Sequence, residues 1–188
     1  MQCDPASFVP AAPPYDHPVK TWLRRLRALP VAAALLAVAG SASVSGAAAR
    51  AVPRPPAQEA AHCRALHAEL PETVAGLKRG ALRPASEFTA QWGAPAVLLR
   101  CGVSRPDALT YGSKSFDRYA PAWDIGGIEW FAEPQSGGGV RFLATHRAAW
   151  VEVTLPKQYA GGSGATDGTD VLAELASRIR KTIPEGYV

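Results

Sequence analysis

The stretch from Gln91 to Val103 constrains the fold more than any other part of this chain. It begins with the turn-forming residues Trp92-Gly93 and Pro95, continues as an apolar run over residues 96–99, and ends beside Cys101. An apolar run of this length between turn signals is typical of a buried strand. We therefore expect a central strand here. We also expect that the bond or contacts that fix the position of Cys101 stabilise the whole domain.

Length and charge limit the number of domains and the kinds of partner. The 188 residues suffice for one domain with a proper core. The net charge of +4 comes mostly from residues 1–51, which hold five Lys or Arg against two acids. The balanced remainder has no basic stripe interleaved with aromatic residues, so we expect no nucleic acid partner.

The N-terminal quarter has the organisation of an exported or membrane-anchored protein. Residues 1–27 form a Pro-rich tail that ends in a basic cluster, and we expect the tail to be disordered. Residues 28–49 carry no charge, and a helix of that length would reach about 33 Å, enough to cross a bilayer. Because the basic cluster precedes it, the N-terminus is expected in the cytoplasm and the rest outside. Residues 50–57 are Pro-rich and predict a stiff spacer.

Two fates of the apolar segment stay open. Its few large apolar residues end near Gly40, and small residues follow, which is also how a cleavable signal peptide looks. The long basic region in front and the length of the uncharged run favour a single-pass plasma membrane anchor. The alternative is a protein secreted after signal cleavage.

Residues 58–188 predict a small α+β domain. A helical period runs from Gln58 to Pro71, and a second helix follows Thr169 or Asp170 and stops at Pro184. Between them, residues 70–76 predict a turn, 79–90 and 104–123 loops, 125–131 a strand, 140–146 and 149–155 a meander, and 161–168 a flexible connector. We expect an antiparallel sheet of three to four strands with both helices packed on one face.

Several of these motifs occur together in one known family. Cys63 and residues 70–76, 92–103, 127–130 and 151–156 resemble the DUF3515 family of actinobacterial exported or membrane-anchored proteins, over roughly residues 60–183. The most specific part is the string from Trp92 to Val103. The resemblance implies an exported location and a shared fold. It implies no activity, because that family has no established function or catalytic residues.

The two later cysteines predict a disulfide. Cys63 and Cys101 lie outside the cytoplasm in this topology, where thiols oxidise. The bond would close a loop that the chain-entropy model values at roughly 4 kcal/mol. The rival reading is a nucleophilic Cys63 with His67 one helical turn away, which an oxidising location disfavours.

Other cofactor and metal chemistry has weak support. His62, His67 and His146 with Cys63 lack metal-ligand spacing, so we expect no metal. The serine in residues 161–165 misses the nucleophile-elbow pattern, and no phosphate-binding or dinucleotide motif occurs, so we expect no cofactor.

Three kinds of side chain remain as site candidates. The carboxylates of Asp124, Glu129 and Glu133 suggest an acid and base pair, as in glycan hydrolases. Arg100 lies in an apolar strand and must be paired, either with an acid such as Glu72 or Glu129 or with an anionic ligand. Aromatic residues could form a binding platform or the core; the candidates are Trp92 and Trp130, with Trp123 and Trp150.

These observations lead to two principal hypotheses for function. The first is a membrane-tethered or secreted cell-envelope protein, without enzymatic activity, that binds an envelope protein or a cell-wall component. The second is an envelope glycan hydrolase that uses the carboxylates between Asp124 and Glu133. A third is a structural part of a membrane assembly, with residues 28–49 as a packing helix.

Overall fold

The computed structural model describes residues 51–161 and 168–186. Among them no helix has both the length and the apolar character needed to cross a membrane. The predicted tail at residues 1–27, the apolar segment at 28–49 and most of the glycine-rich connector lie outside the described residues.

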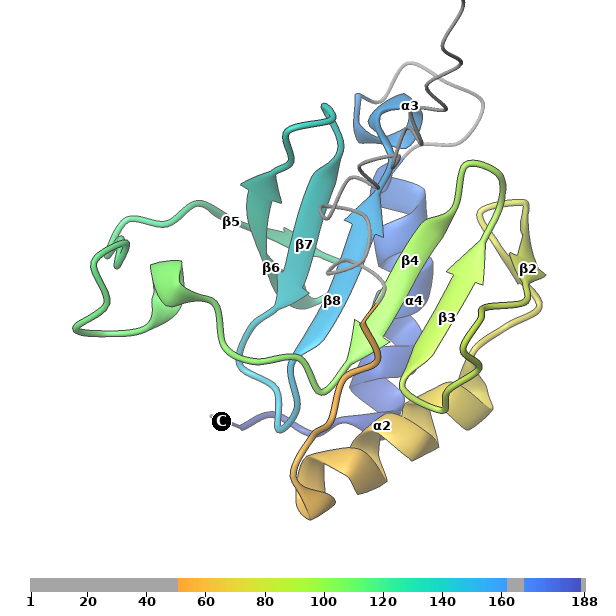
Figure 1. Cartoon of the computed structure of the whole chain (residues 1–188), viewed down its shortest axis with the longest axis horizontal. Coiled ribbons are helices and arrows are strands. Elements are labelled where there is room, and N and C mark those ends of the chain that lie inside the picture. The colour runs from red at the N-terminus through yellow and green to blue at the C-terminus, as the bar shows by residue number, and fades with distance from the viewer. Residues whose placement is uncertain (1–50, 162–167, 187–188) are drawn as a thin grey trace, which may run out of the picture. The chain divides into compact units, whose positions relative to one another are not determined.

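An eight-stranded antiparallel sheet forms the centre of the domain, in the order β1-β2-β3-β4-β8-β7-β6-β5 (Figure 1). The strands are β1 (Thr73–Val74), β2 (Leu77–Gly80), β3 (Thr89–Trp92), β4 (Val97–Cys101), β5 (Ala122–Ile125), β6 (Ile128–Pro134), β7 (Val140–Ala144) and β8 (Val151–Leu155). The predicted central strand is β4, which pairs with β3 and β8.

Two long helices cover one face of this sheet. They are α2 (Ala57–Glu69) and α4 (Gly168–Thr182), whose buried residues join one core cluster with the sheet; Figure 1 shows α4 behind the strands and α2 below the lower ends of β3 and β4. The short helix α3 (Lys157–Ala160) follows β8, and a 3-10 turn, η1 (Asp107–Leu109), lies in the connection after β4. The predicted α+β class with both helices on one face is therefore present.

The apolar stripe predicted for the last helix is the side that it buries. Val171, Leu172, Leu175 and Ile179 are all less than 2% exposed and join one core cluster with Leu66 of α2. Helix α4 has Asp170 in its first turn and basic residues in its last, as the helix dipole favours. Helix α2 begins directly after Pro56, where the missing N–H would have had no helical partner.

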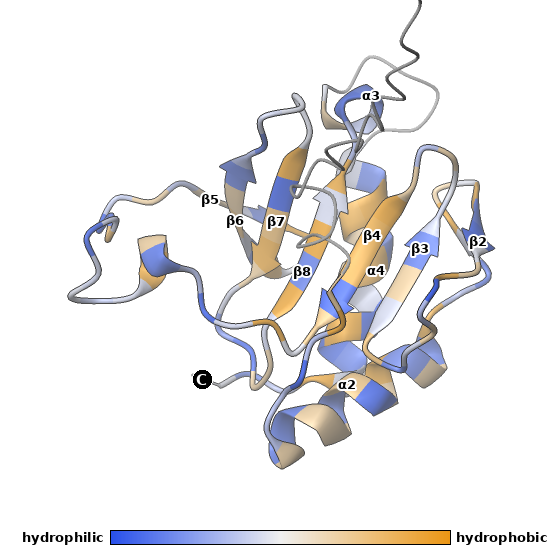
Figure 2. Ribbon diagram, viewed as in Figure 1, coloured by the Kyte–Doolittle hydropathy of each residue, from blue (hydrophilic) through white to orange (hydrophobic). Residues whose placement is uncertain are grey.

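Alternation along the strands separates the sheet into a core face and an open face. In β4 the residues Val97, Leu99 and Cys101 are buried against the helices, whereas Leu98 and Arg100 point to the other side. Figure 2 shows the hydrophobic colour concentrated in β4, β7 and β8. The single large core therefore lies between the sheet and the two helices.

The prediction of a sheet with three to four strands is wrong, because the sheet has eight strands. The predicted turn at 70–76 contains β1, and the predicted loop at 79–90 contains the end of β2 and the start of β3. These strands have two to four residues, and β2 is never fully buried. Such short strands form because their backbones hydrogen-bond to a neighbouring strand. Their sequences therefore show little of the apolar and polar alternation from which a strand is predicted.

The predicted strand at residues 125–131 is instead two strands joined by a tight turn. Gly126 and Gly127 both have positive φ, at 66° and 73°, and connect β5 to β6. A Cβ atom on Gly126 would lie 2.8 Å from the Cβ of Ala176 in α4. Glycine is needed here both for the turn and for the close approach of the helix.

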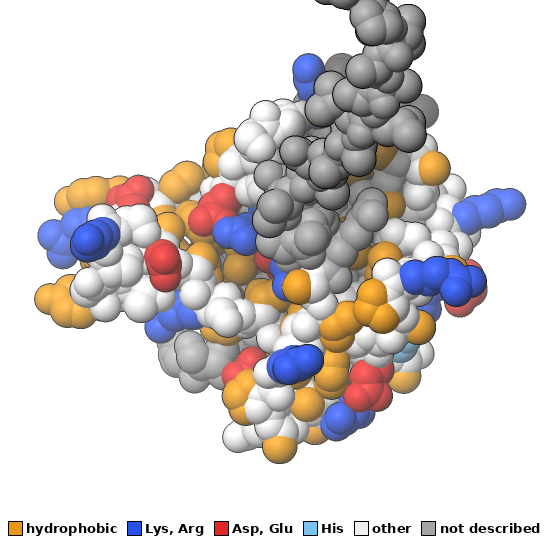
Figure 3. Space-filling model, viewed as in Figure 1, with side chains coloured by type: hydrophobic (Ala, Val, Ile, Leu, Met, Phe, Trp, Pro, Cys, Tyr) orange, Lys and Arg blue, Asp and Glu red, His pale blue; other side chains and the backbone are white. Residues whose placement is uncertain are grey.

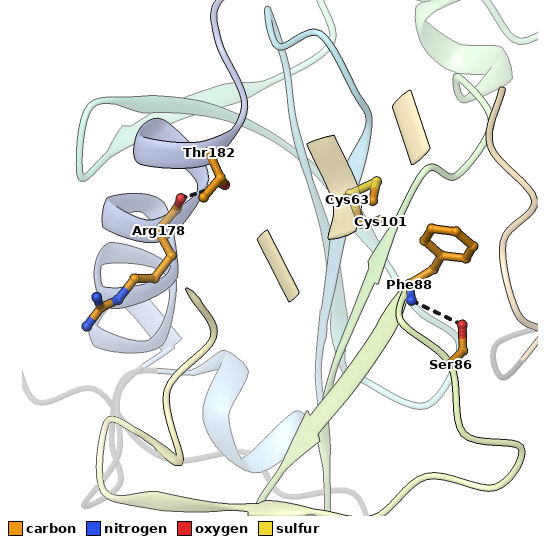
Figure 4. The surroundings of a disulfide bond; sticks show 6 residues. All are labelled: Cys63, Ser86, Phe88, Cys101, Arg178 and Thr182. Carbon is orange, nitrogen blue, oxygen red and sulfur yellow. Dashed lines mark hydrogen bonds between the residues drawn. A yellow bond between two sulfur atoms is a disulfide. The ribbon is translucent and has the colours of Figure 1, made fainter. Parts of the chain in front are cut away.

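The structure contains the disulfide between Cys63 and Cys101, which joins α2 to β4 across the core (Figure 4). Both cysteines are 1% exposed. The amide of Cys101 donates to the carbonyl of Phe88 at 2.9 Å, and Phe88 packs against the same core cluster. The bond therefore fixes the first helix to the central strand from inside the core.

The described part of the predicted spacer lies against the domain. Pro53 is buried, and a Cβ atom on Gly102 would come within 2.4 Å of the Cβ of Pro55. Pro53 and Pro55 thus pack against the domain, Pro55 beside the end of β4, before α2 begins.

A smaller apolar cluster lies on the open face. Phe131, Leu143 and Trp150 form it, and Leu109 of η1 packs against them. The long connection at residues 102–121 is held there and projects beyond the sheet (Figure 1). This arrangement places a loop over one corner of a face that the helices leave uncovered.

Candidate ligand-binding cleft

A cleft of about 430 Å³ opens between the 102–121 connection, the turn that joins β7 to β8, and the C-terminal segment at Gly186. These segments lie at the same end of the sheet in Figure 1. Its walls combine an aromatic ring, Trp150, with ionisable side chains from three segments. The ionisable residues that line it are Arg105, Asp117, Arg118, Glu129, His146 and Arg147.

Arg147 is the most deeply buried cation at this cleft. Its side chain is 8% exposed, and its Nε atom has no hydrogen-bond partner in the described structure. The two terminal nitrogens donate to the carbonyls of Ile183 and Gly127, both at 3.4 Å, which is beyond the usual range for such bonds. Among the described residues, the nearest carboxylate is that of Glu185, at 3.7 Å and 85% exposed. The buried charge is thus only weakly compensated.

Two further arginines approach the cleft from the projecting connection. The guanidinium of Arg105 lies 5.8 Å from the ring centroid of Trp150, in cation–π geometry. That of Arg118 lies 5.8 Å from the ring of Tyr119, which is 83% exposed. Within the described residues neither arginine has a carboxylate within 4 Å. Figure 3 shows Lys and Arg side chains gathered on this projection beside a few acids.

The two carboxylates of the cleft already have other partners. Glu129 accepts from the hydroxyl of Thr145 at 3.2 Å and lies 3.9 Å from Nδ1 of His146. Asp117 accepts from the amide of Tyr119 at 2.8 Å. His146 has a positive φ of 55°, which turns the chain sharply between β7 and the residues that follow. The anionic groups are therefore tied to the cleft wall rather than to the arginines.

Arg100 pairs with an acid, but with neither of the two that the sequence suggested. It donates to Glu152 of β8 at 3.1 Å, and Arg141 of β7 lies 3.5 Å from the other oxygen of Glu152. Arg141 also pairs with Glu133 of β6. These four side chains form a charge network across β4, β8, β7 and β6. Glu72 instead faces Arg79 at 3.8 Å.

The proposed acid and base carboxylates are spread along a hairpin. Glu129 and Glu133 share a face of β6, but four residues along a strand separate them by about 13 Å. Hydrolases need the two groups within roughly 5–10 Å. Asp124 is directly opposite Glu129 in the register of β5 and β6, and its carboxylate accepts from the amide of Gly127 at 3.3 Å. Only Glu129 of the three lines the cleft.

The two tryptophans suggested as binding aromatics belong to the core. Trp92 and Trp130 are both 0% exposed, and their indole nitrogens donate to the carbonyls of Pro71 and Ile125. They present no surface to a ligand, because both project to the face that the helices cover. Trp123 is 49% exposed and Trp150 lines the cleft, so these are the two tryptophans of the described domain that reach solvent.

The histidines do not converge. No group of three metal-ligating side chains occurs among the described residues. His67 points its Nε2 toward the guanidinium of Arg79, at 3.2 Å. Burial, and then the positive charge of Arg79, lowers the pKa of His67. His67 lies on the same helix as Cys63, whose sulfur is in the disulfide, so the alternative of a nucleophilic thiol is not realised.

Sequence reasoning overlooked the three arginines of the cleft. Arg105 and Arg118 lie in a connection without a period, and Arg147 lies in a turn between two strands. The one available signal was the position of Arg147, directly before the apolar run Ala148-Ala149-Trp150. That context predicts a partly buried cation but does not reveal which segments surround it.

Comparison with known proteins gives one informative match. Neither the curated proteins nor the solved structures contain a match to this chain. A family described as proteins of unknown function, DUF3515, matches residues 26–188, which include the whole described domain. The chain therefore belongs to the DUF3515 family.

Proposed function

We propose that this protein is a membrane-tethered or secreted cell-envelope protein whose α+β domain binds an envelope component in the cleft beside Trp150. The observation that carries the proposal is the cleft itself, in which three arginines and an aromatic ring meet around about 430 Å³. Cavities of this size accommodate small ligands or one group of a larger one. Its carboxylates serve as partners for a hydroxyl, a histidine and an amide.

Two further features support an extracytoplasmic location. The disulfide in the core suits an oxidising compartment. The family match begins at residue 26, so the region shared within the family includes the apolar segment at 28–49. Either an anchor or a cleaved signal peptide is compatible with both features.

A glycan hydrolase is the second candidate, and one observation favours it. Asp124 and Glu129 are directly opposite each other on neighbouring strands. The distance between side chains in such a pair is close to the distance between the two catalytic carboxyls in retaining enzymes. Against this, Asp124 does not line the cleft, and Thr145 and His146 hold Glu129 to the wall. Binding without turnover agrees better with this geometry.

The proposal is tested by sedimentation of the full chain, in neutral detergent, with isolated cell walls and with beads that carry immobilised envelope lipids. The wild type is compared with the double variant Arg105→Ala, Arg118→Ala, which removes two cleft cations. A double variant of two exposed lysines outside the cleft, Lys78→Ala and Lys114→Ala, is the matched control for charge. We expect co-sedimentation that the arginine variant reduces at least tenfold and the lysine variant leaves unchanged.

The same samples separate binding from hydrolysis. Release of soluble sugar fragments by the wild type, abolished in Glu129→Gln, would replace the binding proposal with the hydrolase. Absence of co-sedimentation with every envelope fraction would refute both. Protease accessibility of the domain in intact cells tests the location, because a cytoplasmic domain would be protected.

A further inference from the structure

We propose that the cleft binds an oxyanion, a phosphate or carboxylate group of its ligand, and that Arg147 is the residue that pairs with it. This inference rests on the proposed function, because it names the chemical class of the ligand in the same cleft. In structural terms, the anion would supply the partner that the buried guanidinium of Arg147 lacks.

The first argument is the cost of burying an uncompensated charge. A charged group taken out of water must be paired and hydrogen-bonded, or its burial is strongly unfavourable. Arg147 is more than nine-tenths buried, has an unpartnered Nε, and otherwise makes two 3.4 Å contacts to carbonyls. A planar guanidinium matches the two oxygens of a carboxylate or phosphate, which would give Arg147 the charge-assisted hydrogen bonds that its two 3.4 Å contacts do not provide.

The second argument is the position of the other two arginines. Arg105 and Arg118 line the same cleft and lack carboxylate partners within 4 Å among the described residues. Three cations that converge on one cavity repel one another when the cavity holds no anion. The arrangement therefore favours a negatively charged ligand and disfavours a cationic one.

The third argument concerns the acids nearby. Glu129 and Asp117 line the cleft but are bonded to Thr145 and to the amide of Tyr119. Of the acids in the described part of the chain, Glu185 is nearest to Arg147, and its 3.7 Å separation and 85% exposure make it a weak partner. Glu185 therefore competes with a ligand for Arg147 without neutralising the charge of Arg147. Removing the charge of Glu185 should then strengthen ligand binding.

The test measures binding of inorganic phosphate and of acetate to the full chain in neutral detergent, by isothermal titration and by amide NMR shifts. Choline chloride is the cationic counterpart. We expect saturable binding of at least one anion, weakening as sodium chloride is added, and none of choline. Glycerol phosphate in solution and detergent micelles that contain phosphatidylglycerol then distinguish a free anion from a lipid headgroup.

Four variants assign the site. Arg147→Gln is expected to weaken anion binding about tenfold or more, since a charge-assisted hydrogen bond contributes about 1.5–3 kcal/mol. Glu185→Gln is expected to strengthen it roughly two- to fivefold, because it removes a competing exposed carboxylate. A gain of affinity cannot result from misfolding. Arg118→Ala should weaken binding, whereas Lys114→Ala, on the same connection but outside the cleft, should not change it.

Every outcome decides the inference. Anion binding that depends on Arg147 and increases in Glu185→Gln supports it. No saturable binding of phosphate or acetate, or equal binding in wild type and Arg147→Gln, overturns it.

The two proposals fail separately. Envelope fractions that bind the wild type and Arg147→Gln equally, without competition by phosphate or acetate, would refute the oxyanion and leave the binding function. Anion binding without co-sedimentation of any envelope fraction would refute the envelope-binding function and leave the oxyanion site.

Discussion

Glu152 shows at the scale of one residue how the open face is stabilised. Its carboxylate is 4% exposed and lies between Arg100 at 3.1 Å and Arg141 at 3.5 Å. A buried carboxylate of this kind is tolerated only because cations on the adjacent strands compensate it. It also explains how an arginine can lie in the most apolar strand of the sheet.

We expect Glu152→Gln to lower the free energy of unfolding by about 3 kcal/mol, because it leaves Arg100 buried without its counter-ion. Glu133→Gln, at a site that is 25% exposed, should cost less than about 1 kcal/mol. The double variant Arg100→Met, Glu152→Leu should recover much of the loss. Urea unfolding measures all three, and equal losses in the two single variants would contradict this account.

His67 makes stability depend on pH. Burial and Arg79 lower its pKa in the folded state below the ordinary value of about 6.5, so the unfolded chain takes up the proton first. Stability is therefore complete above that ordinary value and decreases as pH falls through it toward the lowered pKa. We expect the urea concentration at the unfolding midpoint of the wild type to decrease as the pH is lowered from 7.5 to 5.5. In His67→Gln this midpoint should change less over the same pH range. An identical pH profile for both proteins would contradict this role.

At the scale of elements, the disulfide connects the first helix to the central strand. The sequence separation of 38 residues gives a loop-closure contribution of about 4 kcal/mol in the chain-entropy model. We expect Cys63→Ala, Cys101→Ala to lose about that much in urea unfolding. Cys3→Ala is the matched control and should unfold like the wild type. A loss below about 1 kcal/mol would show that helix and strand pack equally well without the bond.

The connection between β4 and β5 shows how an element without regular structure contributes to a site. Leu109 packs against the Phe131, Leu143 and Trp150 cluster, and this contact holds Arg105 and Arg118 beside the cleft. Nothing in the sequence of that connection indicates which face of the sheet it covers. Its position depends on a few apolar side chains that the paired strands bring together from distant parts of the sequence.

At the scale of the whole molecule, one face of the sheet carries the core and the other carries the charges. Leu175 of α4 is 0% exposed in the main cluster, whereas Leu98 of β4 points to the open face and is half-buried. We expect Leu175→Ala to lower the free energy of unfolding by about 2–5 kcal/mol and Leu98→Ala by clearly less. Similar losses, measured by urea unfolding, would show that the open face is as well packed as the core.

The sequence by itself determined the two helices, the central strand, the meander and the pairing of Cys63 with Cys101. Each of these leaves a local signature, such as a helical period, an apolar run or a pair of cysteines. Short strands such as β2, the glycine turn at Gly126, the partner of Arg100 and the cleft around Arg147 were decided only by tertiary structure. They depend on which backbone or side chain arrives from a distant segment, and a local pattern contains no information about that neighbour.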